Sequence, residues 1–202
     1  DLLTVEVTPV YGMVEDRSGR MWFATWNGIY SYVPGSDRLV HIDPTETLLQ
    51  VHTWTIMEDR RGHIWVGTEG GGITILKKSG SDHVEVERHI VHRQADGSGL
   101  SDNRVYALYE DRHGIVWIGT GNGLNRLDPR TGAIQQFLVS PNGLPNAMIA
   151  GIVEDDNGYL WVSHKAGISR IDKNTFTVRN YSLQDGLQSN EFLEGAVLKS
   201  RY

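Results

Sequence analysis

The sequence predicts an all-β protein made of β-propeller blades, each with four antiparallel strands. Two observations support this prediction: one nine-residue motif recurs four times, and short apolar runs and turn residues surround every copy. The copies are Val14–Trp22, Met57–Trp65, Tyr109–Trp117 and Val153–Trp161. Their tryptophans are separated by 43, 52 and 44 residues, close to the length of a propeller blade.

Each copy divides into four expected strands. The first strand ends at Glu-Asp, an Asp-x-x-Gly turn follows, and the second strand carries the tryptophan. The third strand begins at a glycine (Gly28, Gly72, Gly123 and Gly167), and a turn such as 128–132 leads to the fourth. No segment has a sustained 3.6-residue period. We therefore expect blades at about residues 4–47, 48–99, 100–144 and 145–188, and the first strand of a further blade within 189–202.

The repeated residues have structural explanations. The aspartate of each Glu-Asp pair is expected to accept backbone N–H groups in its own turn, where the glycine supplies a positive φ. Each tryptophan is expected to pack between neighbouring sheets. Small residues on the first strands are expected near the propeller axis, where the strands converge: Gly12, Thr55, Ala107 and Gly151.

Composition excludes several classes of protein. The 202 residues include no cysteine, which excludes disulfide scaffolds and thiolate metal sites. The 19 Lys and Arg residues against 25 Asp and Glu give a net charge of −6, which argues against nucleic acid as a partner. No apolar run approaches the ~20 residues that span a bilayer, so we expect no membrane insertion by this segment. The chain begins at Asp1 without a signal peptide, and we expect an excised piece.

The chemical motifs predict no catalytic residue, no metal and no cofactor. Gly119–Gly123 resembles a phosphate loop but leads into a strand, so no helix N-terminus is available for an anion. Asp155–Gly158 is a fragment of a calcium loop without the distal glutamate. His89 and His92 fall in an expected strand, where their spacing puts them on opposite faces.

Two long stretches, Glu58–Ile73 and Glu110–Asp128, resemble the two-component regulator propeller repeat. The tail Asp185–Phe192 is similar to the sequence that enters the last blade of such regions. The resemblance implies a periplasmic, extracytoplasmic part of an inner-membrane receptor that acts as a homodimer. It also implies a histidine kinase or a diguanylate cyclase as the output of the parent receptor. The first copy departs from the repeat at Ala24 and Trp26, and the fourth departs at Ser163 and His164.

The number of blades favours a fragment over a closed ring. Four blades and one further strand fall short of the seven blades expected for the family's sensor region. A closed four-bladed ring is the alternative, but it would leave the extra strand as an exposed edge. We therefore expect a partial propeller that belongs to a larger one.

The candidate ligand-binding surface lies where the four copies differ. The loops between the second and third strands differ most, and in a propeller they share one face with the connections between blades. Loops on a rigid scaffold often form binding sites. Trp26 is suited to stack on a sugar ring, although covering a neighbouring blade is an equal alternative for it. The candidates are Trp26, Asn27, Glu69, Asn103, Arg104, Asn122, Asn146, His164 and Lys165.

These observations predict a non-catalytic module for ligand sensing or dimerisation, with a small solute or an oligosaccharide as the ligand. One alternative is a propeller enzyme, such as a lyase, for which His164 is a candidate residue without matching partners. A scaffold that binds another protein is a further alternative. The longest interval places roughly eight extra residues between Lys77 and Gly99, where we expect a longer outer hairpin or rim loop.

Overall fold

The computed structural model describes residues 9–36, 39–42, 52–79, 83–93, 95–193, 195 and 197. They form four antiparallel sheets whose strands follow chain order. The first sheet comprises β1 (Val10–Glu15), β2 (Met21–Thr25), β3 (Gly28–Tyr32) and β4 (Leu39–Ile42). The second comprises β5 (Thr53–Glu58), β6 (Ile64–Thr68), β7 (Ile73–Lys78) and β8 (Val84–Ile90).

The other two sheets repeat this arrangement. The third comprises β9 (Val105–Glu110), β10 (Val116–Thr120), β11 (Gly123–Leu127) and β12 (Ile134–Phe137). The fourth comprises β13 (Ile149–Glu154), β14 (Tyr159–His164), β15 (Gly167–Asp172) and β16 (Val178–Tyr181). Within the described residues, helix is confined to one 3-10 turn, Leu183–Asp185. The predicted all-β fold with four-stranded antiparallel blades is therefore confirmed.

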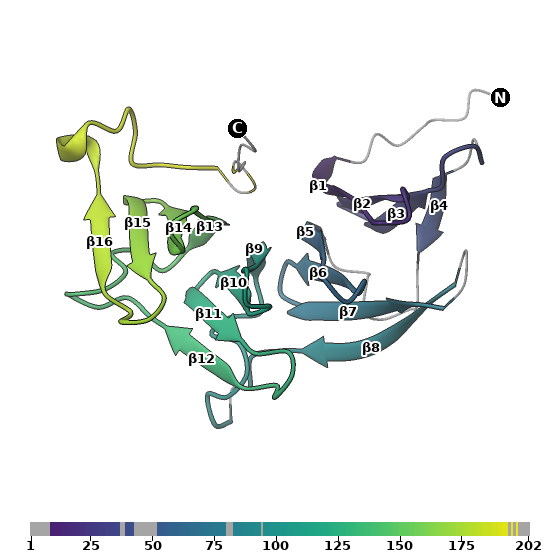
Figure 1. Cartoon of the computed structure of the whole chain (residues 1–202), viewed down its shortest axis with the longest axis horizontal. Coiled ribbons are helices and arrows are strands. Elements are labelled where there is room, and N and C mark those ends of the chain that lie inside the picture. The colour runs from purple at the N-terminus through teal and green to yellow at the C-terminus, as the bar shows by residue number, and fades with distance from the viewer. Residues whose placement is uncertain are drawn as a thin grey trace.

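The four sheets fan around a common centre as an open arc (Figure 1). The first strand of each sheet lies nearest the centre and the fourth lies at the periphery (Figure 1). Gly195 donates its N–H to the carbonyl of Ala150 in β13, at 3.2 Å, and lies near Tyr11 of β1. Gly195 therefore lies between the first and last blades.

A strand was expected within residues 189–202. The described part of this range contains no strand, and residues 194, 196 and 198–202 lie outside the described residues.

The hydrophobic core is divided into three clusters, each between two neighbouring blades. Trp22 lies in the cluster between the first and second blades, Trp65 in the next and Trp117 in the third. All three side chains are at most 1% exposed, as predicted for rings packed between sheets. Trp161 is half-buried, because the described residues include no further sheet against its face. The protein is therefore stabilised mainly at the seams between blades.

The repeated aspartate closes the first turn of its blade and also binds the tryptophan. In the third blade, Oδ1 of Asp111 accepts the N–H groups of His113 at 2.8 Å and Ile115 at 3.1 Å. Its Oδ2 accepts the indole N–H of Trp117 at 3.1 Å. The same bonds recur around Asp16, Asp59 and Asp155. These contacts confirm the predicted role of the aspartate and add the ring contact, which the sequence did not indicate.

The glutamate before the aspartate and the arginine that follows it in the first three blades connect neighbouring blades. Glu154 of the fourth blade accepts the backbone N–H of Arg112 in the third at 3.0 Å. The Arg112 guanidinium in turn donates to the carbonyl of Asp155, at 2.7 Å. Equivalent bonds join Arg60 to Glu110 and to the carbonyl of Arg112, and Arg17 to Glu58 and to the carbonyl of Arg60. One Glu-Asp-Arg sequence therefore builds the turn and also joins it to the next blade.

Lysine side chains reinforce two of the three seams. Lys173 Nζ lies 2.8 Å from Oδ2 of Asp111 in the third blade and 2.6 Å from Oε1 of Glu154 in the fourth. Lys78 bridges Asp16 and Glu58 in the same way, at 2.9 and 2.8 Å. Carboxylates that are removed from water require such partners.

The predicted insertion in the second blade takes two forms. Strand β8 has seven residues, whereas the fourth strands of the other sheets have four. A loop then follows in which His92 forms an isolated bridge with Gly99. Residues 80–82 and 94 of the expected insertion lie outside the described residues.

The small residues of the first strands have a more specific role than expected. A Cβ atom at Gly12 would lie 3.5 Å from backbone atoms of Thr55 and Ile56 in the second blade. Ala107 packs in the cluster between the third and fourth blades. These residues line the centre, as predicted, and they also let the next innermost strand approach closely.

His164 takes the place of a threonine that ends the second strand in the other blades. Thr120, for example, accepts the N–H of Asn122 at 3.1 Å through Oγ1. In the fourth blade, Nδ1 of His164 accepts the N–H of Ala166 at 3.1 Å, and Nε2 contacts Ser169 at 2.8 Å. The His164 side chain is completely buried, and burial lowers its pKa to about 4. It is therefore a neutral imidazole that holds the turn.

We expect Trp117→Ala to lower the free energy of unfolding by ~3–5 kcal/mol, because it empties a fully packed site between two blades. Replacing the neighbouring Glu110 by alanine removes one hydrogen bond to Arg60 and should cost only ~1 kcal/mol. Denaturant melts of both variants measure the difference. Equal denaturation midpoints for the two variants would show that the Trp117 indole does not stabilise the contact between the blades.

We also expect His164 to make stability depend on pH. In the unfolded chain the imidazole binds a proton near pH 6.5, whereas in the folded protein it does so only near pH 4. The free energy of unfolding should therefore fall by ~3 kcal/mol as the pH falls from 6.5 to 4. In His164→Gln this contribution disappears, and urea melts across the window measure it. A variant with the slope of the wild type would contradict the assignment.

Candidate functional site

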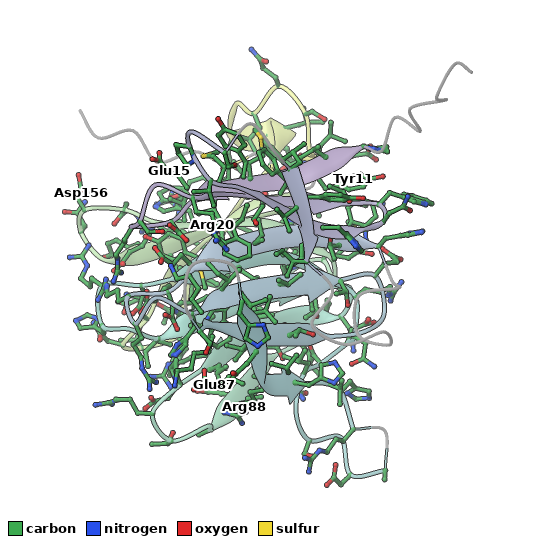
Figure 2. The ribbon with its side chains drawn as sticks, turned by 90° about the vertical axis from the view of Figure 1, so that its right-hand side faces the viewer. Tyr11, Glu15, Arg20, Glu87, Arg88 and Asp156 are labelled. Carbon is green, nitrogen blue, oxygen red and sulfur yellow. The ribbon has the colours of Figure 1, made fainter. Side chains whose placement is uncertain are left out.

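The loops between second and third strands meet the connections between blades on one rim of the arc. Gly70 and Gly72 donate their N–H groups to the carbonyl of Asn103, at 3.2 and 2.9 Å. Gly121 donates to the carbonyl of Arg104 at 3.0 Å. The expected convergence of the two sets of loops is therefore observed. Figure 2 shows this rim at Tyr11, on the side opposite the turns that carry Glu15 and Asp156.

Five aromatic side chains follow one another along this rim from the first to the third blade. The Trp26 ring stacks on His52, with centroids 3.4 Å apart. Tyr11 lies 6.5 Å from Trp26 and 4.5 Å from Trp54, and Trp54 lies 5.9 Å from Tyr106. Trp26 is 45% exposed, so it offers a face to solvent while it covers His52. We call these five residues the aromatic rim.

The aromatic rim borders a cavity of about 390 Å³ among the innermost strands. Tyr11, Trp54 and Tyr106 line it, together with small residues such as Gly12 and Gly151. The small residues leave space at the centre, while the aromatic rings occupy the edge. The result is a concave surface with an aromatic border, a form typical of small-molecule sites.

Polar groups lie beside the rings. The indole N–H of Trp54 donates to Oε2 of Glu69, whose own N–H donates to the carbonyl of His52 at 2.8 Å. Arg104 is held by Asp102 through two bonds, at 3.1 and 2.7 Å, and this pairing raises the pKa of the guanidinium. Glu69 forms an isolated bridge with Arg104, which brings the second and third blades together here.

The structure brings most of the predicted residues together. Trp26 and Asn27 lie at the start of the aromatic rim, and Glu69 bonds the indole of Trp54. Arg104 and Asn103 reach the loop of Glu69 through their backbones, while Oδ1 of Asn103 accepts the N–H of His92 at 2.6 Å.

Three further candidates occupy the same set of loops farther along the arc. Asn122 donates to the carbonyl of Ser101 at 3.4 Å. Asn146 accepts the N–H of Met148 at 3.0 Å, in the connection before the fourth blade. Lys165 is exposed in the loop that His164 holds.

His164 does not belong to this surface. Its side chain is completely buried and both ring nitrogens have partners within the blade, so it cannot offer hydrogen bonds to a ligand on the rim. His164 became a candidate because the other three copies of the repeat have a threonine at this position. Its burial follows from performing the same turn-closing role as that threonine.

Four rim residues were missed from the sequence: Tyr11, His52, Trp54 and Tyr106. Three of them occupy one column of the repeat, directly before the small residue of each first strand, and the fourth blade has Ala150 there. The aromatic column was the signal that could have identified them. His52 has no such signal, because its position depends on stacking against Trp26.

Comparison with known families matches the model described as "Two component regulator propeller" at residues 5–27, 47–70, 99–122 and 143–165. No curated protein matches the chain. Among the residues that the structure describes, no helix has the length and hydropathy needed to cross a membrane.

Solved structures resemble the chain over most of its length. The extracellular domain of a putative hybrid two-component system from B. thetaiotaomicron is 27% identical, with a TM-score of 0.81 over 96% of this chain. A putative one-component system from the same organism, again an extracellular domain, is 26% identical, with a TM-score of 0.71 over 91% of the chain. The chain spans about a quarter of the length of both structures, 26% and 24%.

Virginiamycin B lyase from Staphylococcus aureus is 17% identical, with a TM-score of 0.62, over 89% of this chain and 57% of the lyase. At this identity the likeness shows a common fold alone. The family model, in contrast, matches the beginning of every blade. Each of the four blades therefore carries a two-component regulator propeller repeat, and the chain belongs to the family of proteins built from it.

Proposed function

We propose that this chain is a non-catalytic sensing module in the extracytoplasmic part of a two-component receptor, and that the aromatic rim binds its ligand. The continuous row of rings from Trp26 to Tyr106 carries this proposal. The similarity to extracellular domains of two-component systems supports the receptor context.

The chemistry of the rim favours an oligosaccharide. Sugar rings present apolar C–H faces that pack on exposed aromatic rings, and their hydroxyl groups require hydrogen-bond donors and acceptors. Trp26 supplies the exposed face, Asn27 follows it directly in the chain, and the carboxylate of Glu69 lies against the indole of Trp54. The cavity of about 390 Å³ gives such a ligand room to extend toward the centre.

Signalling follows from the position of the site across blades. The aromatic rim draws residues from three blades, so a bound ligand contacts several seams at once. A ligand that binds one arrangement of these blades more tightly shifts the population toward it. In a homodimeric receptor, with the chain on the periplasmic side of the inner membrane, this shift would change the relative placement of two protomers and the kinase or cyclase they control.

We expect Trp26→Ala and Trp54→Ala each to weaken binding of an oligosaccharide about fivefold, since stacking on one ring contributes ~1 kcal/mol. The measurement is calorimetric titration of the purified protein with oligosaccharides that raise its melting temperature in a panel screen. Phe176→Ala is the matched control, because this ring is 36% exposed and lies in the hairpin between β15 and β16.

Two outcomes would contradict the proposal. If no oligosaccharide in the panel binds, the rim does not recognise this class of ligand. If one binds with equal affinity to the wild type and to both tryptophan variants, the site lies elsewhere. Circular dichroism melts of each variant show that a loss of affinity does not reflect unfolding.

A further inference from the structure

A second cavity, of about 630 Å³, lies at the outer edge of the arc, away from the aromatic rim. Its walls come from β8 of the second blade, from the loop after β8 and from the start of β12 in the third blade (Figure 1). The polar residues that line it include Arg88, His89, Arg93 and Gln136, and the His89 ring contacts the carbonyl of Gly71 at 2.6 Å. This cavity is therefore formed largely by the insertion that distinguishes the second blade.

The wall formed by the loop is held in place by hydrogen bonds. Nε2 of Gln136 in β12 donates to the carbonyls of Gly97 and Gly99, at 3.0 and 3.1 Å. Within the loop, Arg93 donates its N–H to the carbonyl of Ser98 at 2.8 Å. These bonds tie the loop to the third blade, so the cavity is already formed without a ligand.

Two of the residues that line the cavity, Arg88 and Arg93, are arginines and give it a positive charge. Arg88 alternates with Glu87 along β8: Glu87 contacts Nε2 of His63 at 3.2 Å, while Arg88 lies against the backbone of Gly132. Figure 2 labels both residues near the lower edge of the view. Within the described part of the chain, no carboxylate lies within 4.0 Å of the Arg88 guanidinium, although Asp59 and Glu87 share a smaller neighbouring pocket with it. Among the residues that the structure describes, no aspartate or glutamate lines the cavity.

Arg93 is the second cation, and one exposed carboxylate lies near it. Hydrogen bonds from Ser98 lower the pKa of Asp96, and the charge of Arg93 adds to this effect. Asp96 does not line the cavity, so its negative charge offsets part of the positive charge of Arg93 from outside the cavity. A cationic cavity stands out on a chain whose net charge is −6.

We propose that this cavity binds a small polyanion through the guanidinium groups of Arg88 and Arg93. Guanidinium groups bind carboxylate, sulfate and phosphate oxygens through two parallel hydrogen bonds, which makes arginine the preferred residue for such groups. The volume falls within the range of small-molecule sites. The ligand class is therefore a solute with several oxyanion groups, such as an acidic sugar or a polycarboxylate.

The test is calorimetric titration of the purified protein with citrate, pyrophosphate and digalacturonate at constant ionic strength. Lactose serves as the uncharged probe. We expect at least one polyanion to bind, lactose not to bind, and Arg88→Gln to weaken the binding about tenfold, as expected for the loss of a hydrogen bond to a charged group. Which of the three binds best distinguishes carboxylate, phosphate and acidic-sugar ligands.

Arg179→Gln is the matched control. Arg88 pairs with Ile75, which in turn pairs with Trp65, and Arg179 occupies the same position relative to Trp161 in the fourth blade. Both arginines are exposed on the outermost strand, but only Arg88 lines the cavity. Binding should be unchanged in Arg179→Gln and also in Trp26→Ala, which keeps this site distinct from the aromatic rim.

The proposal is wrong if none of the three polyanions binds, or if Arg88→Gln binds as tightly as the wild type. Arg93→Gln provides an independent test, because Arg93 lies in an exposed loop and its side chain does not support the sheet. Should Arg88→Gln fail to fold in melting experiments, unchanged binding by Arg93→Gln would still overturn the two-arginine site.

Discussion

The carboxylate of the repeated aspartate is the group on which every blade depends. One oxygen closes the turn between the first two strands, and the other holds the indole N–H of the tryptophan six residues later. The aspartate thereby couples a backbone conformation to the orientation of the largest side chain at the seam. Because the flanking glutamate and arginine bind the neighbouring blade, one short motif determines the turn, the core and the spacing between sheets. A buried carboxylate with so many donors is fully satisfied, so its removal from water is compensated.

This motif fixes the residues on one face of the arc, because they form the hydrogen bonds between blades. It does not constrain the residues on the opposite face. The turns that carry Glu-Asp-Arg are tied to each other by hydrogen bonds across blades, so substitutions there would disturb the seams. On the opposite rim, the backbone supplies most of the bonds between loops. Side chains such as Trp26 and Asn27 are therefore available for recognition. The aromatic rim and the cavity beside β8 both use residues that the repeat does not require.

The repeat, the strand order and the burial of three tryptophans could be predicted from the sequence, because these depend on contacts that recur in every blade. The candidate site could be predicted only in part. Convergence of the two sets of loops follows from the alternating direction of the strands, which placed Glu69 and Arg104 correctly on one rim. The burial of His164 could not be predicted. The sequence shows that a histidine replaces the threonine of the other blades, but not whether the histidine also closes the turn. The stacking of His52 on Trp26 could not be predicted either, because it depends on the angle between two blades.

The location of the core between blades has a consequence for how the protein responds to what it binds. A single sheet has no apolar interior of its own here, so its order depends on its neighbours, as in other repeat proteins. The aromatic rim crosses two of the three seams, joining Trp26 to Trp54 and Trp54 to Tyr106 through ring contacts. A ligand bound along that rim would contact three blades at once. It would therefore couple the order of neighbouring sheets more tightly than their own short strands do. Binding would then restrict the motion between blades more at the inner edge of the arc than at its periphery. Ligand binding would thus change the stiffness of the protein.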